Sequence, residues 1–122
     1  MDPIAQLVTS LKTHAMAGKS TARIASSRFK REILDKLAQL GFVGEIDEKK
    51  ERGRSFLIIE LKPLDNIKRI SKPSRRVYLK SHQIPLIRAK RSRLLLTTPQ
   101  GVMTDFEARK RGIGGEVILE VS

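Results

Sequence analysis

The apolar residues of this chain lie in short groups, and the longest apolar runs are only a few residues, such as Phe56-Leu57-Ile58-Ile59. None approaches the roughly 20 apolar residues that cross a bilayer, and the first residues lack the apolar stretch of a signal peptide. Apolar residues make up 39% of the 122 residues and aromatic residues only 4%. We therefore expect a soluble, intracellular protein with a thin, aliphatic core and no membrane partner.

Two segments in the first half have the apolar spacing of helices. Asp2-Pro3 reads as an N-cap followed by proline, and it opens a helix that stops near Gly18. Ser26 or Ser27 can cap a second helix, with Gly41 as its C-cap. The apolar stripes of the two helices are Ile4, Leu7, Val8 and Leu11, and Phe29, Ile33, Leu34, Leu37 and Leu40.

Alternating apolar residues predict strands in the rest of the chain. Residues 21–25 form one, and residues 43–48 and 55–62 form a hairpin around the polar stretch 49–54. The turn-forming residues of Pro63-Leu64-Asp65-Asn66 predict a boundary between two subdomains. Beyond it, strands are predicted at residues 67–70, 77–79, 94–98 and 116–121.

A short helix is predicted between the last two strands, because Thr104 and Glu107 have the spacing of a capping box and Gly112 can end the helix. The sequence as a whole predicts an α+β fold of two small subdomains. Residues 1–64 are expected to pack two helices on a three-stranded sheet. Residues 65–122 are expected to form a strand-rich unit with one short helix and most of the contacts to a partner.

The charge of the chain is strongly positive and unevenly placed. There are 25 Lys and Arg against 13 Asp and Glu, a net charge of +12. Residues 67–93 hold ten basic residues and no acidic one. A solvated face usually mixes both signs, so this stretch favours a phosphate-bearing partner, a nucleic acid, over an anionic membrane or an acidic protein.

Three places, one inside this stretch and two after it, allow more than one interpretation. Tyr78 can stack on a base or sugar, or it can be a half-buried strand residue with its hydroxyl in water. Thr97 and Thr98 end a strand before Pro99, where their hydroxyls can bond base edges or 2′-hydroxyls, although the residues alone favour a plain turn. Gly114-Gly115 can permit close approach to RNA or simply form a turn.

Catalysis finds little support in the sequence. The absence of cysteine excludes disulfides, thiol catalysis and cysteine-bound zinc. His14 and His82 are isolated and lack metal-ligand spacing, and no phosphate-binding loop is present. We expect no enzyme activity, cofactor, metal or small-molecule substrate, although a hydrolase or nuclease with an unrecognised site is the rival from another class.

The residues from Thr97 to Asp105, followed by Glu107-Ala108-Arg109-Lys110 and Gly114-Gly115-Glu116, closely resemble the C-terminal signature of the family of bacterial small-subunit ribosomal protein eight. Further segments agree in the same order. They are Asp2-Pro3-Ile4-Ala5, Ile70-Ser71-Lys72-Pro73, Arg75-Arg76-Val77-Tyr78 and Ile84-Pro85, so the similarity spans nearly the whole chain.

This resemblance implies a two-subdomain protein of the small ribosomal subunit, cytoplasmic or in an organelle ribosome, that supports assembly and translation. Its partners would be a helix in the central domain of small-subunit rRNA, neighbouring ribosomal proteins and its own messenger RNA. The alternative is a non-ribosomal RNA-binding module, such as a messenger-RNA repressor. The expected RNA-binding residues are Ser71, Lys72, Arg75, Arg76, Tyr78, Arg91, Arg93, Thr97, Thr98, Pro99, Gly114, Gly115 and Glu116.

The chain departs from the family pattern at the expected contact turn. Thr97 replaces the usual serine, and Arg91-Ser92-Arg93 replaces the usual glycines. The extra arginine charge is expected to compensate in part for a looser turn. We also expect Thr98→Val to remove only a hydroxyl that faces RNA, and so to leave the packing of the protein unchanged.

Overall fold

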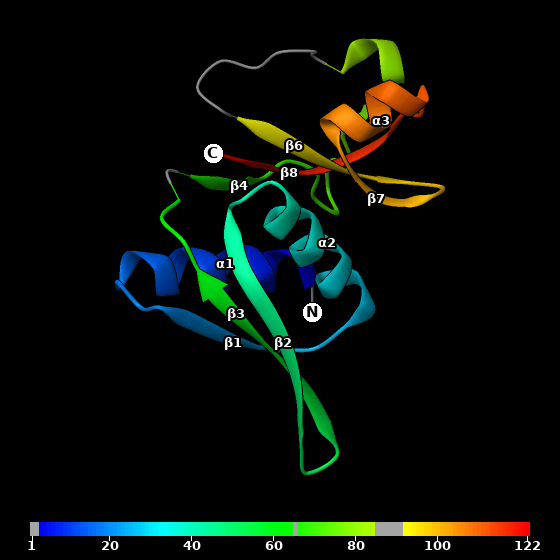
Figure 1. Ribbon diagram of the computed structural model, residues 1–122. Coiled ribbons are helices and arrows are strands. Elements are labelled where there is room, and N and C mark those ends of the chain that lie inside the picture. The colour runs from blue at the N-terminus through cyan, green and yellow to red at the C-terminus, as the bar shows by residue number, and fades with distance from the viewer. Residues whose placement is uncertain (1–2, 65, 85–91) are drawn as a thin grey trace. The chain divides into compact units, whose positions relative to one another are not determined.

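A computed structural model describes residues 3–64, 66–84 and 92–122. The chain divides into two compact units, Met1–Leu64 and Asp65–Ser122. Both units combine helices with antiparallel strands (Figure 1). The predicted α+β class is therefore confirmed. Within the described ranges, no helix has the length and apolar character needed to cross a membrane.

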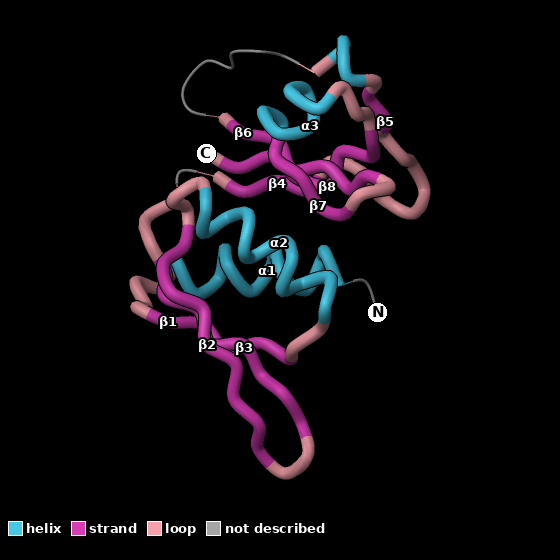
Figure 2. Tube along the Cα trace, turned by 45° about the vertical axis from the view of Figure 1, so that its right-hand side comes forward, coloured by secondary structure: helices cyan, strands magenta, loops and turns pink. Residues whose placement is uncertain are grey.

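The first unit packs helices on an antiparallel sheet whose strand order is β1-β3-β2. Its elements are α1 (Pro3–Met16), β1 (Thr21–Ala25), α2 (Arg28–Gln39), β2 (Val43–Glu51) and β3 (Arg54–Leu61). Figures 1 and 2 show both helices on one face of this sheet. That face supplies the buried core, which includes Leu7, Leu11, Ile33, Leu34, Leu37, Leu57 and Ile59.

The ends of α2 follow the sequence prediction. The Ser27 side chain accepts a hydrogen bond from the Lys30 backbone N–H, which satisfies one of the unpaired donors of the first turn. At the other end, Gly41 has a φ of +85°. The Phe42 N–H donates to the Leu37 carbonyl at 2.9 Å, as in a Schellman motif. The predicted cap of α1, Asp2, lies outside the described residues.

The hairpin of β2 and β3 is longer than the sequence prediction. The predicted turn stretch 49–54 is wrong, because β2 continues to Glu51 and β3 begins at Arg54. Only Arg52 and Gly53 form the turn, and both have positive φ, 52° and 78°. Positive φ at both central residues is typical of the tight turn that matches the twist of a hairpin. The ends of these two strands are polar and lack the alternation of apolar and polar residues by which strands are predicted from sequence.

The second unit is built on a sheet whose strands run in the order β4-β8-β6-β7, with β5 also paired to β8. Its elements are β4 (Ile67–Arg69), β5 (Tyr78–Leu79), the 3₁₀ helix η1 (Ser81–Gln83), β6 (Arg93–Thr98), β7 (Gly101–Thr104), α3 (Asp105–Arg111) and β8 (Gly115–Val121). The sequence did not predict β7, since its four residues lie between a turn and a helix cap.

The short helix α3 begins and ends as predicted. Thr104 and Glu107 form both bonds of the capping box, and Gly112 adopts the left-handed conformation with a φ of 68°. The helix packs on one face of the sheet through an aliphatic cluster. This cluster comprises Ile84, Leu94, Leu96, Met103, Ala108 and Val117.

Candidate nucleic-acid interface

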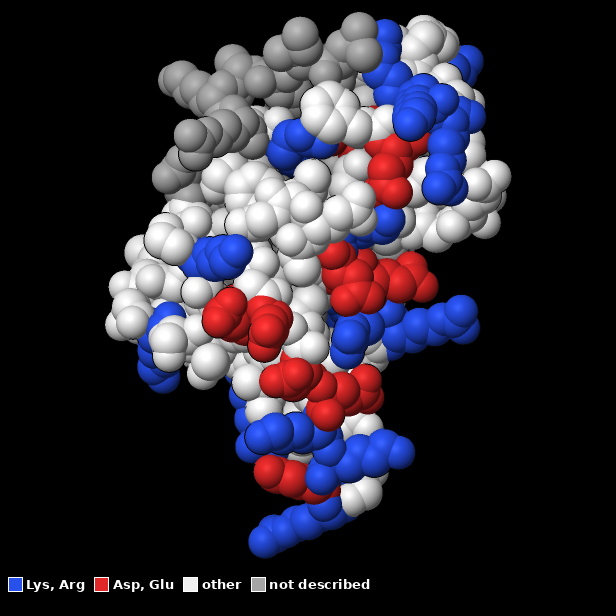
Figure 3. Space-filling model, viewed as in Figure 1, with Lys and Arg blue, Asp and Glu red and all other residues white. Residues whose placement is uncertain are grey.

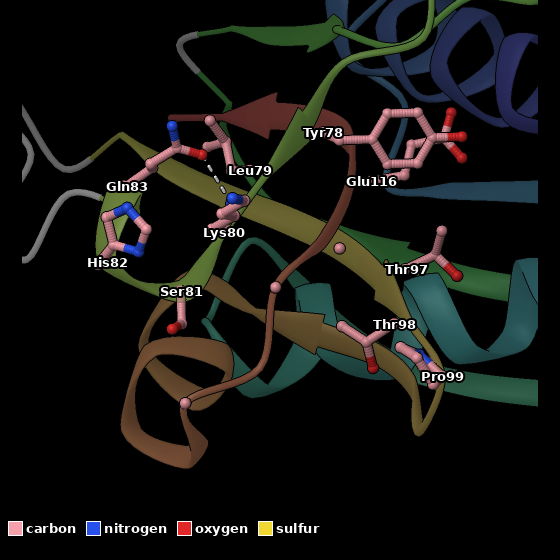
Figure 4. A pocket seen from close by; sticks show the side chains of 13 residues that line it. Tyr78, Leu79, Lys80, Ser81, His82, Gln83, Thr97, Thr98, Pro99 and Glu116 are labelled. Atoms are coloured by element: carbon pink, nitrogen blue, oxygen red, sulfur yellow. Dashed lines mark hydrogen bonds between the residues drawn. The ribbon is translucent and has the colours of Figure 1, made fainter.

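Three neighbouring strands of the second unit bring distant parts of the chain into one row. Tyr78 of β5 lies opposite Glu116 of β8, and Glu116 lies opposite Thr97 of β6. Directly opposed residues share a face of an antiparallel sheet. Figure 4 shows Tyr78 and Glu116 side by side, with Thr97 next to them. We call Tyr78, Glu116 and Thr97 the cross-strand row.

The aromatic member of the row is open to solvent. Tyr78 is 66% exposed, so the alternative of a half-buried strand residue is wrong. The ring is therefore accessible to a partner that stacks on it.

The carboxylate of the row is held by a predicted contact residue. Arg76 Nη1 lies 3.0 Å from Glu116 Oε2, and the side chains of Arg76 and Glu116 are 55% and 12% exposed. The ion pair fixes the direction of the carboxylate and leaves much of the guanidinium facing water. Two residues that the sequence offered as separate contacts therefore act together.

The turn between β6 and β7 uses the hydroxyl of Thr98 internally. Thr98 Oγ1 donates to the Gly101 carbonyl at 2.8 Å and accepts from the Gln100 N–H at 3.1 Å. The expectation that Thr98→Val removes only an RNA-facing group is therefore wrong, because the substitution also breaks these two bonds. For Thr97, the described part of the chain contains no side-chain hydrogen bond.

The two glycines before Glu116 are required by the protein's own backbone. A Cβ on Gly114 would lie 2.5 Å from the Leu79 carbonyl oxygen, and one on Gly115 would collide with the Thr97 carbonyl oxygen. Neither glycine forms the simple turn that the sequence allowed, since Gly115 begins β8. The pair lets β5 and β6 approach the start of β8 closely, which aligns the cross-strand row.

Ser71 also has a role in the structure of the protein itself. Its side chain is buried and bonds the backbone of Val77 twice, accepting from the N–H at 2.8 Å and donating to the carbonyl at 3.2 Å. These bonds anchor the residue that precedes Tyr78. In the segment between Ser71 and Val77, Lys72 and Arg75 exchange two backbone hydrogen bonds of 2.9 Å. Their side chains are exposed on this tight turn.

A hollow of about 780 Å³ joins most of these groups. Seven predicted residues line it, namely Tyr78, Thr97, Thr98, Pro99, Gly114, Gly115 and Glu116. Its opposite wall was not predicted and is formed by Lys80, Ser81, His82 and Gln83 (Figure 4). The Lys80 N–H donates to Gln83 Oε1 at 2.8 Å, which closes this short turn. The only sequence signal for this wall is the basic stretch to which Lys80 and His82 belong.

The predicted contact residue Arg93 does not line this hollow. Arg93 Nε is 3.0 Å from Asp105 Oδ1, and its guanidinium lies 3.5 Å from the centre of the Phe106 ring. Since Asp105 is buried and Arg93 is its ion-pair partner, this arginine has a clear role in holding α3 to β6. Arg91 lies outside the described residues. Within the described ranges, no group of acids and histidines could hold a metal ion.

Nearly the whole chain matches one known protein family. The model of one family, Ribosomal protein S8, matches residues 2–122. The chain belongs to the ribosomal protein S8 family. This family consists of structural RNA-binding proteins rather than enzymes, so the expectation that the chain is not an enzyme is confirmed.

Curated members of the S8 family are similar along their whole length. The chain is 39% identical to small ribosomal subunit protein uS8 of Thermus aquaticus, with 98% of this chain and 97% of the relative covered. It is 36% identical to protein uS8c of Cuscuta reflexa, covering 98% and 97%. It is 34% identical to protein uS8 of Prochlorococcus marinus, covering 98% and 96%.

Proposed function

We propose that the chain is a structural component of the small ribosomal subunit and binds directly to a helix in the central domain of small-subunit rRNA. The observation that carries this proposal is the cross-strand row, which places an exposed ring, a fixed carboxylate and a hydroxyl together in a chain of the S8 family. The similar proteins are named for the small subunit and come from bacteria and a plant. A bacterial or organelle ribosome is therefore the proposed location.

Each member of the row can make a different contact with RNA. The exposed ring of Tyr78 can stack on an unpaired base, which every base permits through its π face. The Thr97 hydroxyl can both donate and accept, so it suits a base edge or a 2′-hydroxyl. The Glu116 carboxylate only accepts and can receive a base amino group. Together these groups supply recognition rather than general affinity.

General affinity would come from cations on the loop that leads to Tyr78. Lys72 and Arg75 are exposed on their tight turn, and Arg76 is more than half exposed beside Glu116. Their charges can neutralise phosphates next to the base that Tyr78 receives, and release of the condensed counterions favours such contacts. Phosphate contacts of this kind position the protein, and base contacts specify the sequence.

Messenger RNA is the alternative target. A messenger RNA that mimics the rRNA helix presents the same groups, so it would bind the same row. Neighbouring ribosomal proteins complete the proposed set of partners.

Binding of variants to two RNAs tests this proposal. Thr97→Val keeps the shape of the side chain and removes its hydroxyl, which should cost about 1–3 kcal/mol if the hydroxyl meets a desolvated partner. Tyr78→Ala should lose a stacking contribution of about 1–3 kcal/mol. Both losses are expected for the cognate rRNA helix and should be much smaller for an unrelated duplex, measured by filter binding at one salt concentration.

The matched control is Phe106→Ala. Phe106 is an aromatic residue that is 48% exposed, and it does not line the hollow. Its removal should leave both affinities nearly unchanged. Equal losses of the two row variants on both RNAs would show that the row only follows the RNA backbone, and would contradict the proposal.

A further inference from the structure

The end of the β2–β3 hairpin forms a two-stranded ribbon. The chain after β1 reaches it only at its base, where the Ser26 N–H donates to the Ser55 carbonyl at 2.9 Å. The pairing of β1 with β3 ends at Ala25 opposite Phe56. Beyond that pair, Lys50 still lies opposite Ser55 and Glu51 opposite Arg54. Figure 1 shows this hairpin extending away from α1 and α2. We call residues 49–55 the hairpin ribbon.

The hairpin ribbon carries an excess of positive charge. Its cations are Lys49, Lys50, Arg52 and Arg54, and its single acid is Glu51. Figure 3 shows the blue side chains gathered at this end of the first unit. Glu51 is already neutralised from outside the ribbon, because Arg23 Nη2 lies 2.7 Å from its carboxylate. The hydrogen bond and the charge of Arg23 lower the pKa of Glu51, so this carboxyl stays ionised and paired.

Three of the cations face solvent. Lys50, Arg52 and Arg54 are exposed, and within residues 3–64, 66–84 and 92–122 no acidic side chain forms an ion pair with them. Successive residues of a strand point to opposite faces, so Lys50, beside Ser55, lies on the face opposite to Arg54, beside Glu51. Arg52 occupies the turn. The ribbon therefore presents cations on both faces and at its tip.

The residue at the tip is unfavourable for the turn itself. Arg52 has a φ of 52° and is the only non-glycine residue with positive φ among the described residues. Asparagine, aspartate or glycine suits this position better, because an ordinary side chain crowds the backbone there. A long cation at such a place points to a use outside the fold.

We infer that the hairpin ribbon is a second RNA-binding site, which contacts the phosphates of a double-helical segment without reading its sequence. This inference rests on the proposed function for the presence of RNA. Cations on two faces and a tip can reach phosphates on both sides of a groove. A protein partner fits less well, since the ribbon has no aromatic or aliphatic residue to serve as a buried anchor.

The salt dependence of RNA binding distinguishes phosphate contacts made by the hairpin ribbon from a general effect of positive charge. The ribbon variant combines Lys50→Gln, Arg52→Asn and Arg54→Gln. The control variant combines Lys12→Gln, Lys19→Gln and Lys62→Gln, which removes the same charge from exposed positions of the same unit. The ribbon variant should flatten the slope of log affinity against log salt by roughly 2 to 3, for three lost phosphate contacts. The control variant should flatten it by less than about 1.

The change should be the same on the cognate rRNA helix region and on an unrelated duplex, because phosphates are common to both. Equal flattening by the two variants, or none by either, would overturn the inference. The proposed function is judged separately. The row variants Tyr78→Ala and Thr97→Val should bind the cognate rRNA helix less selectively over an unrelated duplex, with an unchanged slope of log affinity against log salt. The ribbon variant should flatten that slope and leave the selectivity between the two RNAs unchanged.

Directed cleavage can then locate the site, since the chain has no cysteine of its own. Arg52→Cys and the control Lys19→Cys each receive a tethered iron chelate and are assembled with small-subunit rRNA and its proteins. The expected result is strong RNA backbone cleavage from position 52 on both strands of one helix, at positions that position 19 does not cleave. Cleavage of a neighbouring protein from position 52, without RNA cleavage, would overturn the inference in favour of a protein contact.

Discussion

Two hydroxyl groups of the second unit, those of Ser71 and Thr98, bond the protein's own backbone. Ser71 bonds both backbone groups of Val77, and Thr98 bonds Gln100 and Gly101. Local sequence cannot distinguish such internal partners from external ones, because the hydroxyl is the same in both cases. The family resemblance implied Ser71 as a contact residue, but the structure buries its side chain.

Ser71→Ala should therefore act on stability. Removal of the buried hydroxyl leaves the Val77 N–H without its Ser71 acceptor, while the Val77 carbonyl keeps the Val117 N–H at 2.9 Å. This loss should lower the free energy of unfolding by about 1–3 kcal/mol. Urea unfolding measures this change. Ser74→Ala is the control, because Ser74 is exposed in the same loop. An equal effect of both substitutions would contradict the role given to Ser71.

The helices and their ends were predictable because each is specified by nearby residues. Ser27, Gly41, Thr104 and Gly112 all act at the predicted helix ends. The strands were less predictable where pairing is set by distant partners. β7 has only four residues, and the polar end of β2 is a strand because β3 pairs with it. The cross-strand row depends on the same distant pairing, so the sequence could suggest its members but not their alignment.

Arg52→Asn tests the conflict between folding and function in the hairpin. Asparagine accepts positive φ more readily than arginine, so the variant should be more stable by a few tenths to about 1 kcal/mol. Its RNA affinity should fall, since the variant removes one proposed phosphate contact. Urea unfolding and RNA binding are measured on the same preparations.

Gly53→Ala provides the comparison for this element. It keeps every charge but places a side chain at a φ of 78°, so stability should fall. A less stable Arg52→Asn variant, or one that binds RNA as tightly as the unchanged chain, would contradict the role given to Arg52.

At the scale of the whole molecule, the proposed account divides two kinds of RNA contact between the two units. The second unit carries the cross-strand row, which suits recognition of a particular RNA site. The first unit carries the hairpin ribbon, which suits phosphates of any helix. The net charge of +12 therefore supports general attraction to RNA, and the row supports selection among RNAs.

Cosedimentation with small ribosomal subunits through a high-salt gradient tests the central claim most directly. High salt weakens phosphate contacts and leaves specific contacts as the main source of retention. We predict that the unchanged chain remains with the subunit, whereas the double variant Tyr78→Ala, Thr97→Val is released at lower salt. Release of both proteins at the same salt concentration would contradict the claim that the cross-strand row recognises small-subunit rRNA.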